Sequence, residues 1–397
     1  MAPEPLNLQG LQAQLKASIR SHGGGFEHWR DLGLTLQMQG AMAGAERALL
    51  QALAENPSHA LSHYTLSRQL DYSHHPQLLC TLEALQPEHY STPEEQILLC
   101  FAKASVFARL GRHGDAAAWL SAGNRLQRQQ TPSDQRDIEQ IVQWRQTLGD
   151  PHTTMPSVDA QAGAGLLFVV GLPRCGSTLL SSILSTNGQI EDLGECEWLE
   201  ACVSEHLQAP AQHPLAGIGD RYLQRVWERS QRPWRIDKSL YNFANLNLIA
   251  QQLPAARVIH CRRHPLAQAL SIHQTRFSEG SRFSTSVEEI ARMLVLERSV
   301  LKQFAETHSH QLFTLQYEAL CTNPEAELKR LLRWLGLPWL PCYLQHHQNK
   351  NTVETASLAQ VRQPIHRQSV ERWRLYRTLL APMVRPLLQA LPNLELF

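Results

Sequence analysis

The stretch "FVVGLPRCGSTLL", residues 168–180, decides the fold of the second half of the chain. It reads as a β-strand that runs into a tight turn and then into a helix, the usual frame for holding a phosphate. Gly171 to Thr178 fits a phosphate loop of the form GxxxxGK[ST] at every fixed place except the lysine, where Ser177 stands. The turn therefore predicts a site for an anion that needs main-chain donors but not that lysine.

Beyond residue 165, short β-rich runs alternate with amphipathic helical stretches. The expected strands are 166–171, 234–237, 257–261 and 312–316. Such alternation predicts an α/β domain in which helices flank a mostly parallel sheet and ligands bind at the carboxyl ends of the strands. The residues that follow those ends are the phosphate loop, Lys238, Arg262 with Arg263, and Tyr317.

The first part of the chain, residues 1–148, is expected to be all-helical and to carry tetratricopeptide repeats, helix pairs of about 34 residues. Small residues at Gly33 and Ala45 would let two helices approach closely. One unit matches the repeat pattern at Trp29, Leu32, Gly33, Leu36, Ala45, Leu49, Ala52 and Pro57. A second matches at Ala104, Gly111, Ala116, Leu120 and Gly123. An ordinary helical bundle is the alternative to such a repeat array.

The segment 149–165 is rich in glycine, proline and small polar residues and has no apolar period, so it is predicted to be a linker. The sequence thus predicts three parts, a helical repeat region at 1–148, this linker, and the α/β domain at 166–397. Two domains also agree with a chain of 397 residues.

Charge and composition narrow the classes of partner. The chain has 37 Lys and Arg against 36 Asp and Glu, so no global field favours nucleic acid or an anionic membrane as a partner. It shows neither a secretory leader nor a long apolar run, which predicts a cytoplasmic protein. Its eight cysteines form no CxxC pair, as expected for reduced thiols, and its 19 histidines show no zinc-binding spacing, so no metal is expected.

The loop itself predicts the kind of anion. Without the lysine it is poorly suited to a triphosphate with Mg²⁺, whereas Arg174 offers a planar fork for a tetrahedral anion. A 5′-phosphate that carries an attached sulfonyl group fits these donors. The main-chain N–H groups expected to face it are those of Cys175, Gly176, Ser177, Thr178 and Leu179.

Several motifs in order carry a family resemblance: "PRCGST" in the loop, "IDKSLYNF", "HCRRHPLAQALS", "QYEALCTNPE" and "TASLAQVRQPIHRQSVERW". Together they resemble the bacterial tetratricopeptide-repeat sulfotransferases, which are related to tyrosylprotein sulfotransferases and use 3′-phosphoadenylyl sulfate. The resemblance covers nearly the whole chain and implies a P-loop-like sulfotransferase domain. The sequence departs from the family pattern at Cys175, Ser177 and His264.

The resemblance implies catalytic roles. Glu195, in "DLGECEWLE", matches the general base, although Glu191, Asp192 and Glu197 share its segment. Lys238 and Arg174 would stabilise the transferred sulfonyl group, and Ser357 would donate a hydrogen bond at the 5′ end. Asp237 is expected to orient Lys238 or to cap the following helix.

The resemblance also implies donor-binding roles. Arg263 and Ser271 match residues that hold the 3′-phosphate, and Tyr317 matches a tyrosine of the nucleotide site. The segment 357–367, which includes Arg362 and Arg367, matches a loop that closes over the phosphates.

The implied reaction moves a sulfonyl group to an acceptor hydroxyl, with adenosine 3′,5′-bisphosphate as the product and no metal. The acceptor stays open among a peptide tyrosine, a sugar and a small alcohol, and a homodimer is also left open. The alternatives are a P-loop kinase and a repeat scaffold that binds nucleotide without catalysis.

Overall fold

The computed structural model describes residues 7–130, 158–277, 282–348 and 363–391, together with positions 142, 145 and 148. The chain divides into two compact units. The first consists of Met1–Pro132 with Arg276–Thr285, and the second of Ser133–Thr275 with Ser286–Phe397. The predicted linker, 149–165, is described from residue 158, where turns lead into the first strand.

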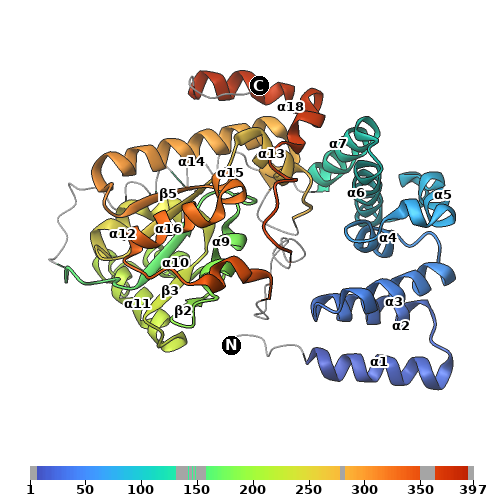
Figure 1. Cartoon of the computed structure of the whole chain (residues 1–397), viewed down its shortest axis with the longest axis horizontal. Coiled ribbons are helices and arrows are strands. Elements are labelled where there is room, and N and C mark those ends of the chain that lie inside the picture. Colours follow the sequence, from blue (N-terminus) through green and yellow to red (C-terminus); the bar gives the residue numbers. More distant parts are fainter. Residues whose placement is uncertain are drawn as a thin grey trace. The chain divides into compact units, whose positions relative to one another are not determined.

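The first unit is helical throughout its described residues (Figure 1). Its α-helices are α1 (Leu8–His22), α2 (Phe26–Met38), α3 (Met42–Glu55), α4 (Ala60–Ser67), α5 (Pro76–Ala84), α6 (Pro93–Arg109) and α7 (His113–Gln130). Its 3-10 turns are η1 (Tyr72–His74), η2 (Pro87–His89) and η5 (Arg282–Thr285). The all-helical prediction is confirmed, and the arrangement is consistent with a helical repeat domain.

Close helix packing explains two of the small residues in this unit. A Cβ built on Gly33 of α2 would lie 2.6 Å from Cγ of Leu49 in α3, and one on Gly123 of α7 would lie 3.0 Å from Cβ of Cys100 in α6. Ala45 and Leu49 are fully buried. Larger residues at the two glycines would push the paired helices apart.

A buried histidine makes the stability of this unit depend on pH. His63 is 0% exposed; its Nε2 donates to Pro57 O at 2.8 Å, and its Nδ1 accepts from the Tyr72 hydroxyl at 3.2 Å. Burial lowers the pKa of His63 from 6.5 to about 4. Between those values the unfolded chain binds a proton that the folded unit rejects, so stability present above pH 6.5 is lost as the pH falls toward 4.

We therefore expect His63 to lower the free energy of unfolding by about 3 kcal/mol between pH 7 and pH 4. Urea unfolding at several pH values, compared between the natural chain and His63→Gln, measures this contribution. His74→Gln is the matched control, because it removes an exposed histidine of the same unit by the same substitution. Equal pH slopes for the natural chain and His63→Gln would contradict the expectation.

The second unit is built on a five-stranded parallel sheet with the order β2-β3-β1-β4-β5. The strands are β1 (Leu166–Val170), β2 (Ile190–Asp192), β3 (Trp234–Asp237), β4 (Arg257–Arg262) and β5 (Leu312–Gln316). β1 is apolar and buried at every position, as expected for a parallel strand covered on both faces. The predicted fold class is confirmed; the prediction missed β2, an edge strand.

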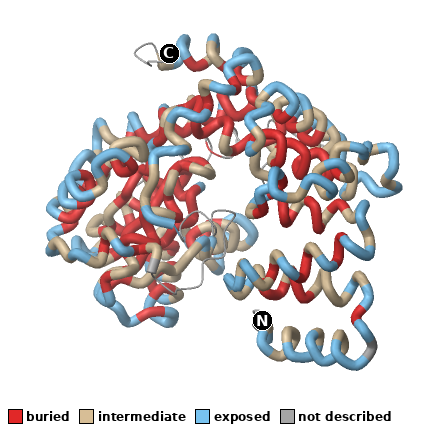
Figure 2. Tube along the Cα trace, turned by 45° about the vertical axis from the view of Figure 1, so that its right-hand side comes forward, coloured by how far each residue is buried: buried red, intermediate tan, exposed pale blue. Residues whose placement is uncertain are grey.

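Helices pack around this sheet (Figure 1). They are α9 (Ser177–Leu184), α10 (Trp198–Gln208), α11 (Ile218–Arg229), α12 (Leu246–Gln252), α13 (Pro265–His273), α14 (Val287–His308), α15 (Tyr317–Thr322), α16 (Pro324–Leu335) and α18 (Arg377–Ala390). The 3-10 segments are η3 (Leu215–Gly217), η4 (Leu240–Asn245), η6 (Pro341–Gln348) and η7 (Arg372–Tyr376). Figure 2 shows buried chain concentrated at the centre of this unit, where β1 packs against α9 and α16.

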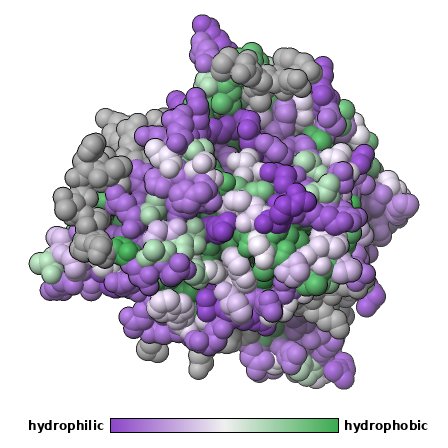
Figure 3. Space-filling view, turned by 60° about the vertical axis from the view of Figure 1, so that its left-hand side comes forward, coloured by the Kyte–Doolittle hydropathy of each residue, from purple (hydrophilic) through white to green (hydrophobic). Residues whose placement is uncertain are grey.

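On the face shown in Figure 3, hydrophobic residues form small patches among hydrophilic ones, a distribution that needs no functional explanation. Within the described ranges, none of the helices combines the length and hydrophobicity that crossing a bilayer requires.

Candidate functional site

The loop after β1 has the backbone that a phosphate cradle requires. Gly176, with φ of 103°, caps α9, and the first helical bond joins Leu180 N to Gly176 O at 3.0 Å. The N–H groups of the turn before Leu180 therefore have no partner further back in the helix. A Cβ on Gly176 would lie 2.5 Å from Cδ2 of Tyr317, so this position requires glycine for both space and conformation.

Cys175 belongs to the core rather than to the surface of the loop. It is 1% exposed, and hydrogen bonds from Cys261 and from Ser177 lower the pKa of its thiol. The hydrogen bond with Cys175, together with burial, raises the pKa of Cys261. Because the Cys175 side chain turns inward, replacing the family's serine there leaves only its main chain for a ligand. Ser177 and Thr178 are also buried, and Leu179 is half-buried.

Arg174 has a positive φ of 66°, which is uncommon for a residue with a side chain and often marks a functional constraint. Its Nε donates to Ser271 Oγ on α13 at 3.0 Å. The structure thus brings Arg174 together with a residue predicted to hold the opposite end of the donor.

Arg263 follows β4, and its side chain contacts the main chain of Arg174. It is 6% exposed; its Nη1 donates to Arg174 O at 2.9 Å and its Nη2 to Ser369 O at 3.0 Å. Its Nε has no hydrogen-bond partner among the residues that the structure describes. A guanidinium has five N–H donors, so this buried cation keeps donors for an anion. Such an orphaned buried donor fits a bound phosphate.

Tyr317, at the start of α15, makes a cation–π contact with Arg263. The guanidinium carbon of Arg263 lies 4.5 Å from the centre of the Tyr317 ring. The Tyr317 hydroxyl and Ser369 Oγ are 2.7 Å apart, and burial raises the pKa of Tyr317, which keeps it neutral. Arg174, Ser271, Arg263 and Tyr317 therefore form one cluster at the carboxyl edge of the sheet, which we call the arginine cluster.

Glu195 and Lys238 form an ion pair at the end of β3. Nζ of Lys238 lies 2.7 Å from Oε1 of Glu195. The lysine side chain is 3% exposed and the glutamate side chain 53%. A buried ammonium thus faces a carboxylate that a ligand can reach from solvent.

The segment that carries Glu195 is held by the main chain of β3. Leu193 N donates to Ile236 O, and Lys238 N to Gly194 O, each at 2.9 Å. Ser239 Oγ accepts from Glu197 N at 3.0 Å. These bonds place the carboxylate opposite the lysine, although the two residues are far apart in sequence.

Asp237 supports the turn after β3. It is fully buried, accepts from the Tyr222 hydroxyl at 2.9 Å and from Ser239 N at 2.8 Å, and so holds the residue that caps η4. Of the competing carboxylates, Glu191 bonds to Ser230 and pairs with Arg229 and Arg232, and Asp192 accepts from Gly194 N.

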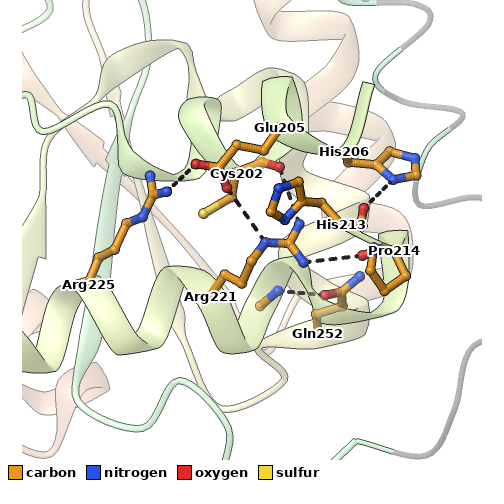
Figure 4. Close-up of polar contacts among 9 residues, drawn as sticks. Cys202, Glu205, His206, His213, Pro214, Arg221, Arg225 and Gln252 are labelled. Atoms are coloured by element: carbon orange, nitrogen blue, oxygen red, sulfur yellow. Dashed lines mark hydrogen bonds and ion pairs between the residues drawn. The ribbon is translucent and has the colours of Figure 1, made fainter. Parts of the chain in front are cut away.

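On the helix that follows the Glu195 segment in sequence, polar contacts join α10 to α11 (Figure 4). Glu205 of α10 pairs with Arg221 and Arg225 of α11, and Arg221 also donates to Cys202 O at 3.4 Å. Gln252 Oε1 accepts from Gly219 N at 2.7 Å. These contacts fix α10, which begins three residues after Glu195.

The structure does not show three of the predicted residues in this arrangement. Ser357 and Arg362 fall outside the described residues. Arg367 is exposed and donates to Thr322 O at the end of α15, at 2.7 Å. Among the described residues, no group of three or more His, Cys, Asp or Glu is arranged to hold a metal ion.

Sequence reasoning missed several residues that the structure brings to the site. Ser369 contacts both Arg263 and Tyr317, and Ser239 holds Glu197. Glu318 Oε1 accepts from His264 N at 2.9 Å. That contact uses the main chain of His264, so the departure from aspartate does not remove it. Ser239, Glu318 and Ser369 all lie within the motifs quoted above, but those motifs do not show which residues their side chains contact.

Comparison with known proteins indicates the family to which part of the second unit is similar. Residues 167–341 match the model of the sulfotransferase family. The α/β unit therefore carries a sulfotransferase-family domain. This match includes the phosphate loop, the Glu195–Lys238 pair and the whole arginine cluster.

Two curated relatives extend the similarity. An uncharacterized protein of Aquifex aeolicus is 27% identical over 382 residues, which cover 90% of this chain and 49% of the relative. Protein-tyrosine sulfotransferase 2 of Gallus gallus is 21% identical over 244 residues, which cover 52% of this chain and 62% of the relative. The chain thus spans less than two thirds of the length of each.

Two solved sulfotransferase structures resemble this chain in part. The sulfotransferase domain of the Synechococcus PCC 7002 olefin synthase covers 56% of this chain and 91% of its own, with 17% identity and a TM-score of 0.42. Sulfotransferase STF9 of Mycobacterium avium covers 77% and 93%, with 15% identity and a TM-score of 0.37.

Proposed function

We propose that this protein transfers a sulfonyl group from 3′-phosphoadenylyl sulfate to an acceptor hydroxyl. The observation that carries the proposal is the Glu195–Lys238 ion pair at the same carboxyl edge of the sheet as the phosphate loop and the arginine cluster. The match to the sulfotransferase family supports it. The proposed domains are a tetratricopeptide-repeat region at 1–148, a linker at 149–165 and the transferase domain at 166–397.

The residues present fit the donor. The first turn of α9 would hold the 5′-phosphate through main-chain N–H groups, close to the positive end of the helix dipole. Arg263, whose buried Nε lacks a partner among the described residues, would hold the 3′-phosphate with Ser271. Arg174, which bonds to Ser271 in this structure, would join the two ends of the donor site. Bound donor supplies the sulfonyl group and departs as adenosine 3′,5′-bisphosphate.

Glu195 would act as the general base, and Lys238 would stabilise the charge that develops on the leaving group. Glu195 takes the proton of the acceptor hydroxyl as its oxygen attacks sulfur, and its accessible carboxylate can meet an acceptor from solvent. Lys238 has three N–H donors, of which one contacts Glu195; the others can stabilise the charge that develops on the bridging oxygen. Ser357 is proposed to donate a hydrogen bond at the 5′ end of the donor, and Arg362 and Arg367 are proposed to bind its phosphates from the segment 357–367.

The acceptor is proposed to be a peptide tyrosine. The similarity to a protein-tyrosine sulfotransferase of Gallus gallus supports this choice, as does a helical first unit of the kind that binds peptides. Sulfonyl transfer to a tyrosine peptide, a phenol, a sugar and a small alcohol, followed by mass spectrometry, distinguishes these acceptors.

A calorimetric titration tests the proposed donor. We expect adenosine 3′,5′-bisphosphate to bind more tightly than AMP and far more tightly than ATP with Mg²⁺. A preference for ATP with Mg²⁺ would favour a kinase and overturn the proposal. Tight bisphosphate binding without transfer to any of the four acceptor classes would favour a non-catalytic scaffold.

A further inference from the structure

A second buried arginine, Arg298 of α14, lies behind Arg263. It is 8% exposed, and its Nη2 donates to Arg263 O at 2.8 Å. Its Nη1 has no hydrogen-bond partner in the part of the chain that the structure describes. Burial lowers the pKa of Arg298 to about 10, so the guanidinium is still charged at neutral pH.

Burying the Arg298 cation costs desolvation free energy, so its presence in the core needs an explanation. Removing a charge from water is unfavourable unless partners compensate it, and an apolar side chain of similar size is often no less stable. The neighbouring acid Glu297 is already bonded to His260, with 2.7 Å between Glu297 Oε1 and His260 Nε2. Fold stability alone is therefore a weak explanation for an arginine here.

Arg298 and Glu318 hold the two polar ends of one peptide group. Arg298 Nη2 binds the carbonyl oxygen of Arg263, and Glu318 Oε1 accepts from the next N–H, that of His264, at 2.9 Å. This peptide joins the end of β4 to α13, which begins at Pro265 and packs beside α14 (Figure 1). With both ends bonded, the backbone from which the Arg263 side chain extends is fixed.

We propose that Arg298 is a positioning residue for recognition of the donor's second phosphate. It acts through Arg263: by fixing the Arg263–His264 peptide, it sets the backbone from which the guanidinium reaches Arg174 O, Ser369 O and the ligand, and so adds to the preorganisation of that guanidinium. The inference rests on the proposed function, since it assumes that Arg263 meets the 3′-phosphate. It concerns affinity for one phosphate and not the transfer step.

The test compares two ligands that differ only in that phosphate. Dissociation constants for adenosine 3′,5′-bisphosphate and AMP are measured with the natural chain and with Arg298→Lys and Arg298→Met. We expect both variants to lose about tenfold in affinity for the bisphosphate and to keep their affinity for AMP. A purely structural role would change both affinities together, because a smaller folded fraction weakens both ligands equally.

Arg257→Lys is the matched control. Arg257 lies at the other end of β4 and also donates to a main-chain carbonyl, with 2.8 Å between its Nη1 and Trp334 O. It should leave the ratio of the two affinities unchanged. Glu318→Ala releases the other end of the same peptide and should lower the ratio as the Arg298 variants do, which gives a second test if those variants fold poorly.

The outcomes separate this inference from the proposed function. If the natural chain does not prefer the bisphosphate over AMP, the proposed donor is wrong. If it does, but the Arg298 and Glu318 variants keep the natural ratio, the positioning role of Arg298 is wrong and the proposed function stands.

Discussion

Glu195→Gln is expected to lower the rate of sulfonyl transfer by about 10²- to 10⁴-fold while leaving affinity for adenosine 3′,5′-bisphosphate unchanged. Glutamine has the same size and can still accept a hydrogen bond from Lys238, so the geometry of the pair is kept. It cannot take the proton of an acceptor hydroxyl, because the amide is not a base at neutral pH. Steady-state rates with saturating donor, together with a binding titration, separate the two effects.

The control for Glu195 lies in the same turn. Glu197 is exposed, and its contact with Ser239 uses its main-chain N–H, which glutamine also supplies. Glu197→Gln should therefore transfer the sulfonyl group at close to the natural rate. Normal turnover by Glu195→Gln would mean that another group takes the proton.

Arg263→Ala should weaken binding of adenosine 3′,5′-bisphosphate by about 100-fold, with a much smaller effect on AMP. The buried guanidinium, which lies over the Tyr317 ring, would make charge-assisted hydrogen bonds to the 3′-phosphate. Arg263→Lys should recover only part of the loss, because a single ammonium cannot reproduce the planar fork.

Arg262→Ala provides the comparison for this prediction. Arg262 precedes Arg263 but is exposed, so its loss removes a neighbouring positive charge without emptying the arginine cluster. Its effect on bisphosphate affinity should stay within a few-fold, because exposed charges are well screened. Equal losses for Arg262→Ala and Arg263→Ala would show that general charge, and not the buried fork, governs binding.

The strands show how far local sequence could predict this fold. β1 is a buried run of apolar residues, and β4 is buried from Val258 to Cys261; such buried runs are typical of parallel strands covered on both faces. β2, Ile190–Asp192, is a three-residue edge strand with two acidic residues, and it has no local signal of that kind. Its pairing with β3 could not be predicted because it depends on a partner more than 40 positions away.

For the candidate site, the sequence by itself determined which chemical groups follow the strand ends: the glycine turn, Arg174, Lys238, Arg263 and Tyr317. A turn, a helix start and a strand end are set by neighbouring residues, so motifs can reveal them.

Only the tertiary structure decided which of these groups touch. It turned the Cys175 thiol into the core, joined Arg174 to Ser271, and placed Arg298 behind Arg263. The physical reason is that burial and hydrogen bonding depend on residues that meet in space, and in these pairs the partners come from different elements of the fold.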